Sequence, residues 1–395
     1  MIALDEALAL TVAEARPLGV ETVSLEAGYD RVLATHVLAR SDAPRRAVSA
    51  MDGYAVLEAD LAQGPQSLLV VERIFAGAAE PAPLGPGTCA RIFTGAPVPP
   101  NADRVVIQEQ VRLTGDRAAF DGPFSLGRHI RAAGSDFRAG DVLVQAGQRL
   151  DARSLVAAAA ADQAGLEVYR RPRVAILGTG DELAEPGQAF ERPGAIPDSV
   201  SLGVLGLARA WGAEVTSRQR LADDPNTLAC AAEAALQAAD VVVVTGGASV
   251  GERDHARSMF ASASLEMVFS KVAIKPGKPV WFARAGDTLV VGLPGNPTSA
   301  LVTARLVLAP LLAGLGGRDP GLALAWHDAR LTAPLGAIGD RETLERGCLR
   351  EGGVEVLNDQ DSGAQRALAR ADVLIRRPPN APALAAGETV TVLDF

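Results

Sequence analysis

The segment DTLVVGLPGNPTSALVTARLVLAPLLAGL, residues 287–315, contains the pattern that decides the fold. Its short, continuous apolar run is typical of a buried parallel strand. A turn of glycine, proline and asparagine follows, and then a long apolar segment that predicts a helix. The same order of apolar run and glycine turn occurs in RVAILGTG at 173–180 and in AADVVVVTGGASVG at 238–251. Such repeats predict a parallel α/β sheet.

The rest of the chain predicts smaller modules around this α/β domain. Residues 41–133 are rich in proline, glycine and short apolar runs, which indicates an inserted β domain. Residues 1–40 and 134–165 contain an amphipathic first helix and an alanine-rich helix that ends at Gly165, and we expect these helices to pack together in a small helical domain. The α/β domain should cover 166–316, and a C-terminal β-barrel-like module should cover 317–395.

Composition restricts the class of protein. The chain has 395 residues, of which 48% are hydrophobic, and a net charge of −9. This charge argues against nucleic acid or a membrane surface as the main partner. Three widely spaced cysteines and an N-terminus without a basic leader favour the cytoplasm. The four histidines form no zinc motif.

The three lysines of the chain all lie in KVAIKPGKP, at positions 271, 275 and 278, although arginine occurs throughout the sequence. A compact ammonium group suits a phosphate or a small tetrahedral oxyanion. The alternation predicts a strand with Lys271 and Lys275 on one face, running into a Pro-Gly turn. The alternative is an exposed strand edge kept soluble by lysine.

The three glycine turns should meet in one crevice, because ligands of open parallel sheets bind beyond the carboxyl ends of the strands. Turns that begin helices offer backbone N–H groups to anions. Asp181, Glu182, Glu252 and Asp254 would lie beside that anion pocket, which suggests a bridging divalent cation. Helix capping is the alternative for Asp181, Asp198, Asp254 and Asp223.

Two further features bear on the site. Two prolines stiffen the turn Gly292-Leu-Pro-Gly-Asn-Pro297, which suits a loop with fixed N–H groups. In the β domain, Asp52 in SAMDGYAV and Thr94 in IFTGAPVP occupy turns. No nucleophile with an adjacent base is evident.

Eight motifs then carry a resemblance to a known family. In order along the chain they are SAMDGYAV, RIFTGAPVPPNADRVVIQE, GRHIRAAGSDFRAGD, ILGTGDEL, LADDP, TGGASVGERD, KVAIKPGKP and GLPGNPTSA. This series, continued by QDSGAQRALARADVLI, resembles the molybdopterin molybdenumtransferase family of molybdenum cofactor biosynthesis, related to the E domain of gephyrin. The resemblance implies insertion of molybdate into adenylylated molybdopterin with release of AMP and Mg²⁺ assistance.

The resemblance, together with the glycine turns, assigns roles to individual residues. The expected catalytic residues are Asp52, Thr94, Asp136, Glu182, Asp223, Asp254, Lys271 and Lys275. The expected ligand-binding residues are Gly178, Gly180, Gly246, Gly247, Ser249, Pro294, Gly295, Asn296, Pro297, Lys278, Pro279, Ser362 and Arg346, with Arg341 as the alternative to Arg346. Lys275, Lys278 and Pro279 would hold molybdate, and Glu182, Asp223 and Asp254 would hold Mg²⁺.

The resemblance also implies a homodimer in which the β domain of one subunit closes the crevice of the other. Molybdopterin adenylyltransferase and proteins of molybdoenzyme maturation are the expected partners, with no nucleic acid and no membrane. Two positions depart from the family pattern: Val200 replaces an asparagine, and Leu344 replaces an aromatic residue. The alternatives are a molybdopterin adenylyltransferase or a non-catalytic scaffold on the same fold.

Overall fold

A computed structural model describes residues 1–62, 64–246 and 256–395 and divides the chain into two compact units. Unit 1 comprises residues 1–35, 146–151 and 167–395, and unit 2 comprises residues 36–145 and 152–166. The expected site residues Gly247, Ser249, Glu252 and Asp254 lie outside the described residues. The finer division into four domains stays a prediction.

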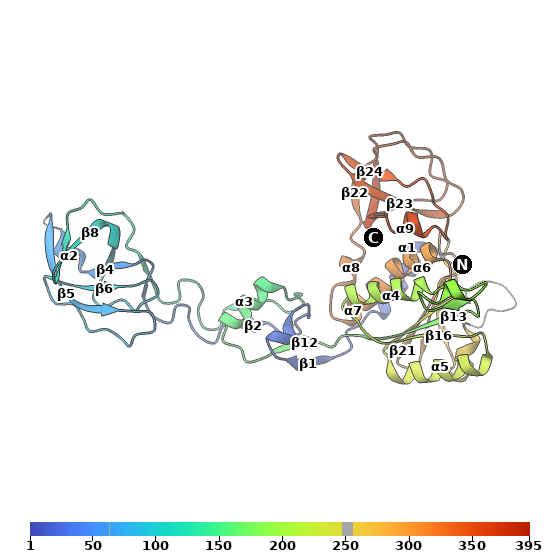
Figure 1. The fold of residues 1–395 in the computed structure, drawn as a ribbon, viewed down its shortest axis with the longest axis horizontal. Helices are drawn as coiled ribbons and strands as arrows, with labels where there is room; N and C mark the ends of the chain where they lie inside the picture. Colours follow the sequence, from blue (N-terminus) through green and yellow to red (C-terminus); the bar gives the residue numbers. More distant parts are fainter. Residues whose placement is uncertain (63, 247–255) are drawn as a thin grey trace. The chain divides into compact units, whose positions relative to one another are not determined.

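One of the two six-stranded sheets of unit 1 is the expected α/β sheet (Figure 1), and its strands have the order β16-β13-β17-β21-β20-β18. Its strands are β13 Arg173–Thr179, β16 Glu214–Leu221, β17 Val241–Thr245, β18 Glu266–Phe269, β20 Trp281–Ala285 and β21 Thr288–Leu293. The first four strands in the sheet order run parallel, which confirms the repeated pattern. β20 and β18 add an antiparallel edge that the pattern does not predict.

The parallel strands are buried on both faces because each face has its own helical layer. Along β13, Val174 and Ile176 belong to one hydrophobic core, and Ala175 and Leu177 belong to another. This alternation follows from the two-residue period of a strand. It also explains why the strand sequences are continuously apolar.

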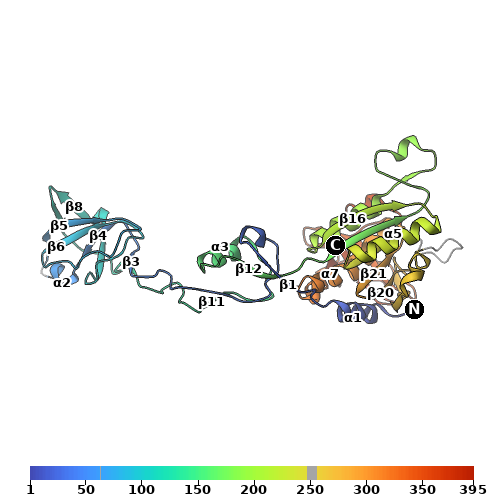
Figure 2. The same ribbon diagram turned by 90° about the horizontal axis from the view of Figure 1, so that it is seen from below.

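Helices of the first core come from distant parts of the chain (Figures 1 and 2). They are α1 Leu4–Glu14, α4 Ser199–Ala210, and the continuous stretch α6 Pro297–Thr303, η5 Ala304–Leu308 and α7 Ala309–Leu315. On the opposite face lie α5 Pro225–Ala238 and the short helix η4 Ser258–Ala263. α1 packs against α7 within unit 1. The physical reason is that the buried residues Leu4 and Ala7 extend the apolar surface of α7.

One helical stretch of the described residues, Pro297–Leu315, is long and apolar enough to cross a membrane by these two criteria alone. However, 94% of its most apolar 18-residue segment is buried inside the protein. Its composition is therefore that of a central core helix.

The C-terminal part of unit 1 forms the expected barrel-like β module (Figure 1). Its strands are β22 His327–Arg330, β23 Glu342–Arg350, β24 Gly353–Val356, β25 Val373–Arg377 and β26 Thr389–Asp394, with α8 Pro320–Ala323 and α9 Gln365–Leu368 beside them. β22 pairs with β26, and Leu331 just beyond β22 forms a bridge to Val354 of β24, which also pairs with β23. The sheet thus closes around an apolar interior.

The lysine segment contributes a strand to this C-terminal sheet. β19 comprises only Ile274–Lys275 and runs parallel to β23, with Lys275 opposite Thr343. The predicted strand through Lys271 is therefore wrong, because Ala273 bends the chain before the strand begins. Lys271 lies outside the strand, and its carbonyl accepts a hydrogen bond from the Ile2 amide.

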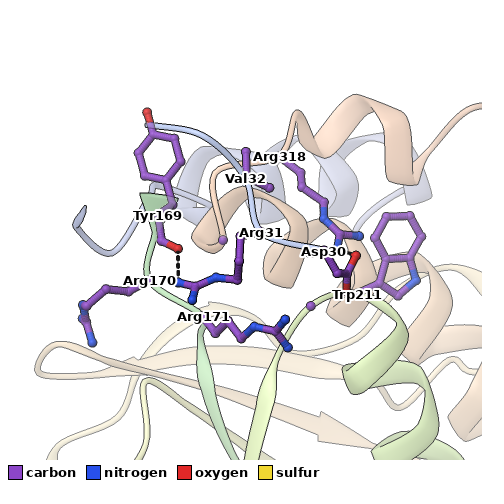
Figure 3. Close-up of a pocket in the computed structure, with 10 residues that line it drawn as sticks. Asp30, Arg31, Val32, Tyr169, Arg170, Arg171, Trp211 and Arg318 are labelled. Atoms are coloured by element: carbon purple, nitrogen blue, oxygen red, sulfur yellow. Dashed lines mark hydrogen bonds and ion pairs between the residues drawn. The ribbon is translucent and has the colours of Figure 1, made fainter. Parts of the chain in front are cut away.

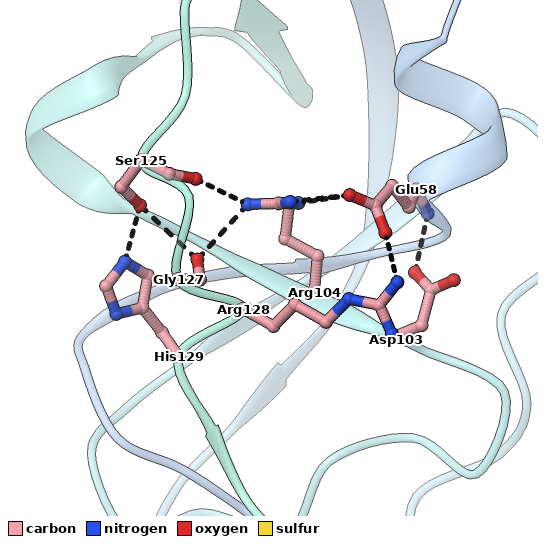
Figure 4. A network of polar contacts seen from close by, with 7 residues as sticks. All are labelled: Glu58, Asp103, Arg104, Ser125, Gly127, Arg128 and His129. Atoms are coloured by element: carbon pink, nitrogen blue, oxygen red, sulfur yellow. Dashed lines mark hydrogen bonds and ion pairs between the residues drawn. The ribbon is translucent and has the colours of Figure 1, made fainter.

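Unit 2 contains a six-stranded sheet in the order β7-β4-β6-β5-β9-β8. These strands are β4 Gly53–Val56, β5 Gln66–Ile74, β6 Thr88–Ile92, β7 Arg104–Ile107, β8 Val111–Thr114 and β9 Arg117–Phe120. A polar network lies beside β7 (Figure 4). In it, Arg104 donates hydrogen bonds to the Glu58 carboxylate and the Ser125 carbonyl, and Arg128 also donates to Glu58. The β domain expected from the proline- and glycine-rich sequence is thus confirmed.

The remaining elements of unit 2 lie before and after this sheet in the sequence, except α2, which lies between β4 and β5. They are β2 Val37–Leu38, β3 Val48–Ser49, α2 Glu58–Leu61, β10 Ile130–Arg131, β11 Val142–Val144 and α3 Ala152–Ala160. α3 packs on β11. The helix ends at Ala160 rather than at Gly165, because Asp162 adopts a left-handed φ of 62° that the helix cannot continue through.

Candidate active site

The three glycine turns lie side by side at the carboxyl ends of β13, β17 and β21. The Thr179 hydroxyl donates to the Thr245 carbonyl over 3.5 Å, which joins the first two turns. A Cβ atom placed on Gly246 would approach the Thr179 carbonyl oxygen to 2.5 Å, and one on Gly295 would lie 3.5 Å from the Gly246 Cα. The convergence predicted from the sequence is therefore confirmed.

A cavity of about 360 Å³ lies at this meeting point. Its lining includes a threonine or glycine from each turn, the carboxylate residues Glu182 and Asp198, and a glutamine of the C-terminal module. The residues are Thr179, Glu182, Leu183, Ile196, Pro197, Asp198, Ser199, Val200, Thr245, Gly246, Gly295, Asn296, Pro297 and Gln365. Ligands of open α/β sheets bind in this position.

The turns differ in how they relate to helices. Asn296 ends the third turn directly before α6, as the sequence predicts. The first turn is instead followed by the short strands β14 Leu183–Ala184 and β15 Ile196–Pro197, and α4 begins only at Ser199. The expected helix N-terminus is therefore missing directly after Gly180, because the intervening chain pairs as a two-stranded sheet.

The acidic residues of the crevice separate into capping and non-capping groups. Asp198 is 2% exposed, accepts a hydrogen bond from the Ser201 amide and pairs with Arg218 at 3.2 Å, so it caps α4. Asp224 caps α5 by accepting from the amide and hydroxyl of Thr227, both at 2.8 Å. The cap is thus Asp224 rather than its neighbour Asp223.

Asp181 and Glu182 lie beside Asp223 at the crevice. The Asp223 amide donates to the Asp181 carboxylate over 3.0 Å, which joins the first turn to the loop before α5. A Cβ atom on Gly180 would come within 2.7 Å of a Glu182 carboxylate oxygen, so this carboxylate lies against the glycine. Of these three carboxylate residues, Glu182 lines the cavity.

These carboxylates have the donor chemistry that Mg²⁺ prefers. Mg²⁺ takes oxygen ligands and is held by one or two carboxylates together with substrate phosphates and water. The described residues contain no group of three side chains that could hold a metal by themselves. Glu182, which lines the cavity, fits a cation shared with a phosphorylated ligand, whereas Asp223 does not line this cavity and Asp254 lies outside the described residues.

A second cavity, of about 330 Å³, adjoins the lysine segment. Its wall combines β19, the start of β23 and the chain before β23. The residues are Lys275, Pro276, Ala337, Ile338, Gly339, Asp340, Arg341, Thr343, Leu344, Glu345 and Gln360. Lys275 and Arg341 supply positive charge here, and burial raises the pKa of Glu345, whose ion pair with Arg377 and nearby Lys275 act in the opposite direction.

The turn that carries Lys278 and Pro279 packs on α6. Gly277 has φ of +107°, and a Cβ atom there would lie 2.3 Å from a methyl carbon of Thr303. The close approach explains why glycine stands between the prolines and lysines of KPGKP. Lys278 is exposed, and its carbonyl accepts from the Val272 amide at 3.1 Å.

The loop 359–365 links the two cavities. Gln360 lines the lysine cavity, Gln365 lines the crevice, and Ser362 lies between them in the sequence. The Asn296 side-chain amide donates to the Ser362 hydroxyl over 2.9 Å, and the Ser362 carbonyl accepts from the Thr298 amide over 3.0 Å. One backbone N–H group at the start of α6 is therefore used to dock this loop.

Arg346 anchors this loop from inside the protein. Its side chain is buried, with 1% exposure, and each of its guanidinium nitrogens donates to a protein acceptor. These acceptors are the Gln360 side chain, the Thr298 hydroxyl, and the carbonyls of Asp361 and Ala364. Of the two arginines expected at the oxyanion site, Arg341 lines the lysine cavity, while Arg346 holds the surrounding elements together.

The expected site residues of unit 2 include one direct pair. The Asp52 carboxylate accepts hydrogen bonds from the amide and the hydroxyl of Thr94, both at 2.8 Å. These bonds hold the pKa of Asp52 below its ordinary value, with the amide contributing most. Asp136 lies in an exposed turn of the same unit, where its amide donates to the Ala43 carbonyl.

Gln360, Gln365 and Thr343 line the cavities but are not among the residues predicted from the sequence. The two glutamines flank Ser362 in the motif QDSGAQ, which is the signal that could have found them. Thr343 has no such signal, because only the pairing of β19 with β23 places it opposite Lys275.

Three family models match the chain in the order of these elements. They are the MoeA N-terminal region (domain I and II) at residues 2–161, a probable molybdopterin binding domain at 175–314, and the MoeA C-terminal region (domain IV) at 328–395. A molybdopterin molybdenumtransferase of Haemophilus influenzae is 34% identical over 100% of this chain and 99% of its own length.

The chain belongs to the molybdopterin molybdenumtransferase family.

Other members agree with this assignment. A molybdopterin molybdenumtransferase of Nostoc sp. is 37% identical over 83% of this chain and 77% of its own length. The crystal structure of a molybdopterin biosynthesis moea protein from Pyrococcus horikosii has a TM-score of 0.84 at 29% identity, covering 100% of this chain and 99% of that one. The resemblance, the multidomain α/β fold and the assignment as a transferase are thereby confirmed.

The two departures from the family pattern occupy defined places. Val200 lines the crevice at the start of α4, and its side chain is 9% exposed. Leu344 is 1% exposed and belongs to the core between the barrel and the α/β layer. Both positions therefore change apolar packing and leave the carboxylate and lysine positions in place.

Proposed function

We propose that this chain inserts molybdenum, supplied as molybdate, into adenylylated molybdopterin and releases AMP with the help of Mg²⁺. The observation that carries the proposal is the loop 359–365, which joins a crevice bordered by carboxylates to a cavity that contains Lys275 and Arg341. The crevice and the lysine cavity can thus hold two ligands that differ in charge distribution, next to each other.

The crevice supplies the groups that suit the nucleotide part of the substrate. Gly246 and Gly295 allow a phosphate close to the backbone, and the helix that begins at Pro297 favours negative charge at its start. When bound by Glu182, Mg²⁺ would neutralise charge on the phosphoanhydride. The carboxylates orient that region without forming a covalent bond to substrate.

The lysine cavity supplies the groups that suit molybdate. Lys275 is a compact donor on β19, and Arg341 offers a planar fork in the same cavity. Lys278, Pro279 and Ser362 belong to the turn and loop beside it. Held there, molybdate would be oriented toward the dithiolene sulfurs of a substrate that lies in the crevice.

The proposal includes a homodimer in the cytoplasm, with Asp52 and Thr94 of one subunit completing the crevice of the other. Support comes from the Asp52–Thr94 hydrogen bonds, which lower the pKa of Asp52 and so favour its ionised form on unit 2. Molybdopterin adenylyltransferase, as the supplier of substrate, and molybdoenzyme-maturation proteins are the proposed partners.

The direct test uses the purified chain with adenylylated molybdopterin, Mg²⁺ and molybdate. AMP release, measured by chromatography, should depend on both ions, and the product should contain molybdenum. A chain that releases no AMP from the authentic substrate would refute the proposal.

The role of Lys275 can be tested by Lys275→Arg. Arginine retains the charge but cannot reproduce a compact ammonium donor, so half-saturation by molybdate should require about tenfold more molybdate. Arg350→Lys is the control for a charge-preserving exchange, because Arg350 pairs with Glu355 at the surface and does not line the lysine cavity. An unchanged molybdate dependence in Lys275→Arg would contradict the assigned role.

A further inference from the structure

One wall of the crevice at the glycine turns is formed by the chain between β13 and α4. It consists of β14, β15, Asp198 and the first residues of α4. Two backbone hydrogen bonds join its strands: the Ile196 amide donates to the Glu182 carbonyl over 2.8 Å, and the Asp198 amide donates to the Ala184 carbonyl over 2.9 Å. Because a pair of such short strands is only marginally stable by itself, the wall depends on a further attachment.

Arg218 of β16 supplies this attachment, because its guanidinium reaches the residue that follows each strand of the wall. One nitrogen donates to the Asp198 carboxylate over 3.2 Å and to the Ser201 hydroxyl over 3.0 Å, and another donates to the Glu185 carboxylate over 2.5 Å. Glu185 directly follows β14, and Asp198 directly follows β15. This arginine clamp, Arg218 with Glu185 and Asp198, therefore ties both strands of the wall to the α/β sheet.

The two ends of the arginine clamp differ in their exposure to water. The side chains of Arg218 and Asp198 are 19% and 2% exposed, whereas the side chain of Glu185 is 42% exposed and also pairs with Arg220 at 3.5 Å. A buried carboxylate without a cation is strongly unfavourable, while an exposed one is solvated by water. The Asp198 end is therefore fixed in the interior, and the Glu185 end can be changed without leaving a buried charge unpaired.

The wall carries groups that face the crevice, although Arg218 is not among the lining residues. Glu182, to which the proposed function assigns Mg²⁺, directly precedes β14 and lines the crevice. The Asp198 carboxylate lies against the first glycine turn, since a Cβ atom on Gly178 would be 3.5 Å from it and 3.5 Å from the Thr245 hydroxyl. Arg218 thus acts on the crevice through the backbone of the wall and not by direct contact.

We propose that Arg218 is a positioning residue, which holds the crevice wall in the place where the nucleotide part of the substrate binds. What the crevice binds rests on the proposed function, whereas the attachment of the wall does not. A planar guanidinium serves two carboxylates at once, but an ammonium group is a single point charge. Lysine at position 218 should therefore keep its bond to the buried Asp198 and lose its bond to Glu185.

Amide hydrogen exchange of the full chain, followed by mass spectrometry, tests the attachment directly. The amides of Ile196 and Asp198 donate across the wall, so their exchange reports how often it opens. Arg218→Lys and Glu185→Ala each release one end of the arginine clamp, and each should raise the exchange rate of the peptide that contains these amides about fivefold. An unchanged exchange rate in both variants would overturn the proposal.

Arg318→Lys is the matched control. Arg318 is shielded from water to a similar degree, with a side chain that is 12% exposed, and it pairs with Asp30 at 3.3 Å. Figure 3 shows this pair beside Trp211, which follows α4 at the end opposite to the crevice wall. The substitution should change the exchange of the wall by less than about twofold, because distant sites act independently. Equal increases in Arg318→Lys and Arg218→Lys would show general loosening and overturn the proposal.

The kinetics of AMP release separate positioning from general damage to the enzyme. Arg218→Lys should raise the KM for adenylylated molybdopterin and the half-saturating Mg²⁺ concentration about fivefold, because the wall and Glu182 are held less firmly. Half-saturation by molybdate should change by less than about twofold, since the lysine cavity shares no lining residue with the crevice. Equal increases for molybdate and for adenylylated molybdopterin would overturn the proposal.

The double variant Arg218→Lys/Glu185→Ala tests whether Arg218 acts through Glu185. Because both substitutions break the same attachment, the double variant should match either single variant in exchange rate and in KM. Effects that multiply would assign separate roles to the two residues and overturn the proposal. If the unchanged chain releases no AMP, the proposed function fails, while the exchange experiment still decides whether Arg218 holds the wall.

Discussion

Gly246 occupies the tightest point of the crevice, with φ of +91° and the Thr179 carbonyl oxygen 2.5 Å from where a Cβ atom would be. Gly246→Ala should therefore strain the backbone and push two turns apart. We expect a loss of about 2 kcal/mol in unfolding free energy and a large loss of AMP release. Urea denaturation and the AMP assay measure both.

Gly206→Ala is the control for that substitution. Gly206 lies in α4, and a Cβ atom there would meet no atom within 4 Å. Alanine should be neutral or stabilise the helix by up to about 1 kcal/mol. A Gly246→Ala chain as stable as this control would contradict the packing argument.

The lowered pKa of Asp52 leads to a prediction about how its hydrogen bonds depend on pH. Its pKa is lowered in the folded state, so its stabilising bonds are fully present above its ordinary pKa of about 3.9 and are lost as the pH falls through the folded value. Thr94→Val removes the hydroxyl donor and should raise the pKa of Asp52 part of the way back, because the amide donor remains.

NMR titration of the Asp52 carboxyl carbon, assigned by comparison with Asp52→Asn, measures this shift. Thr94→Ser retains the hydroxyl and should keep the pKa of Asp52 low. If Thr94→Val left the pKa of Asp52 unchanged, the hydroxyl would have no part in holding the carboxylate.

Among the elements, the loop 359–365 depends on one buried arginine. Arg346→Met would leave the Gln360 side chain, the Thr298 hydroxyl and two carbonyls without their donor. We expect a loss of about 2–4 kcal/mol in unfolding free energy. Because the loop contacts both cavities, AMP release should fall together with the response to molybdate.

Arg350→Met on the same strand is the control. Arg350 pairs with Glu355 at the surface, where an ion pair contributes at most about 1 kcal/mol. Equal effects of the two substitutions on stability would mean that Arg346 does not anchor the loop.

At the scale of the whole molecule, unit 2 has hydrophobic cores of its own. The cores of unit 2, around Tyr54 and Phe120 and around Ile74 and Ile92, contain residues of unit 2 only. A fragment of residues 36–166 should therefore unfold cooperatively on its own, as measured by circular dichroism in urea.

The C-terminal module should behave differently. Leu344, Leu374 and Leu393 pack into the core of the α/β layer, and β23 pairs with β19 from outside the module. A fragment of residues 317–395 would expose these leucines, so it should unfold at lower urea or aggregate. Equal stability of the two fragments would contradict this division.

The local patterns explain why much of the fold could be predicted. Continuous apolar strands such as β17 and β21 must be buried on both faces, and the glycine turns after them then meet at one sheet edge. The pairing of Asp52 with Thr94 could not be read from patterns, since the two residues are 42 positions apart. The family motifs mark both residues as site positions, but only the fold of unit 2 brings them together.

The sequence by itself determined the α/β layers, the glycine turns and the unusual concentration of lysine, because these depend on local periodicity and residue chemistry. Only the tertiary structure decided that the lysine strand joins the C-terminal barrel, that α1 packs on α7, and that Arg346 is an internal anchor. These outcomes depend on which distant segments bury each other's surfaces and satisfy each other's hydrogen bonds. A pattern along the chain does not contain that information.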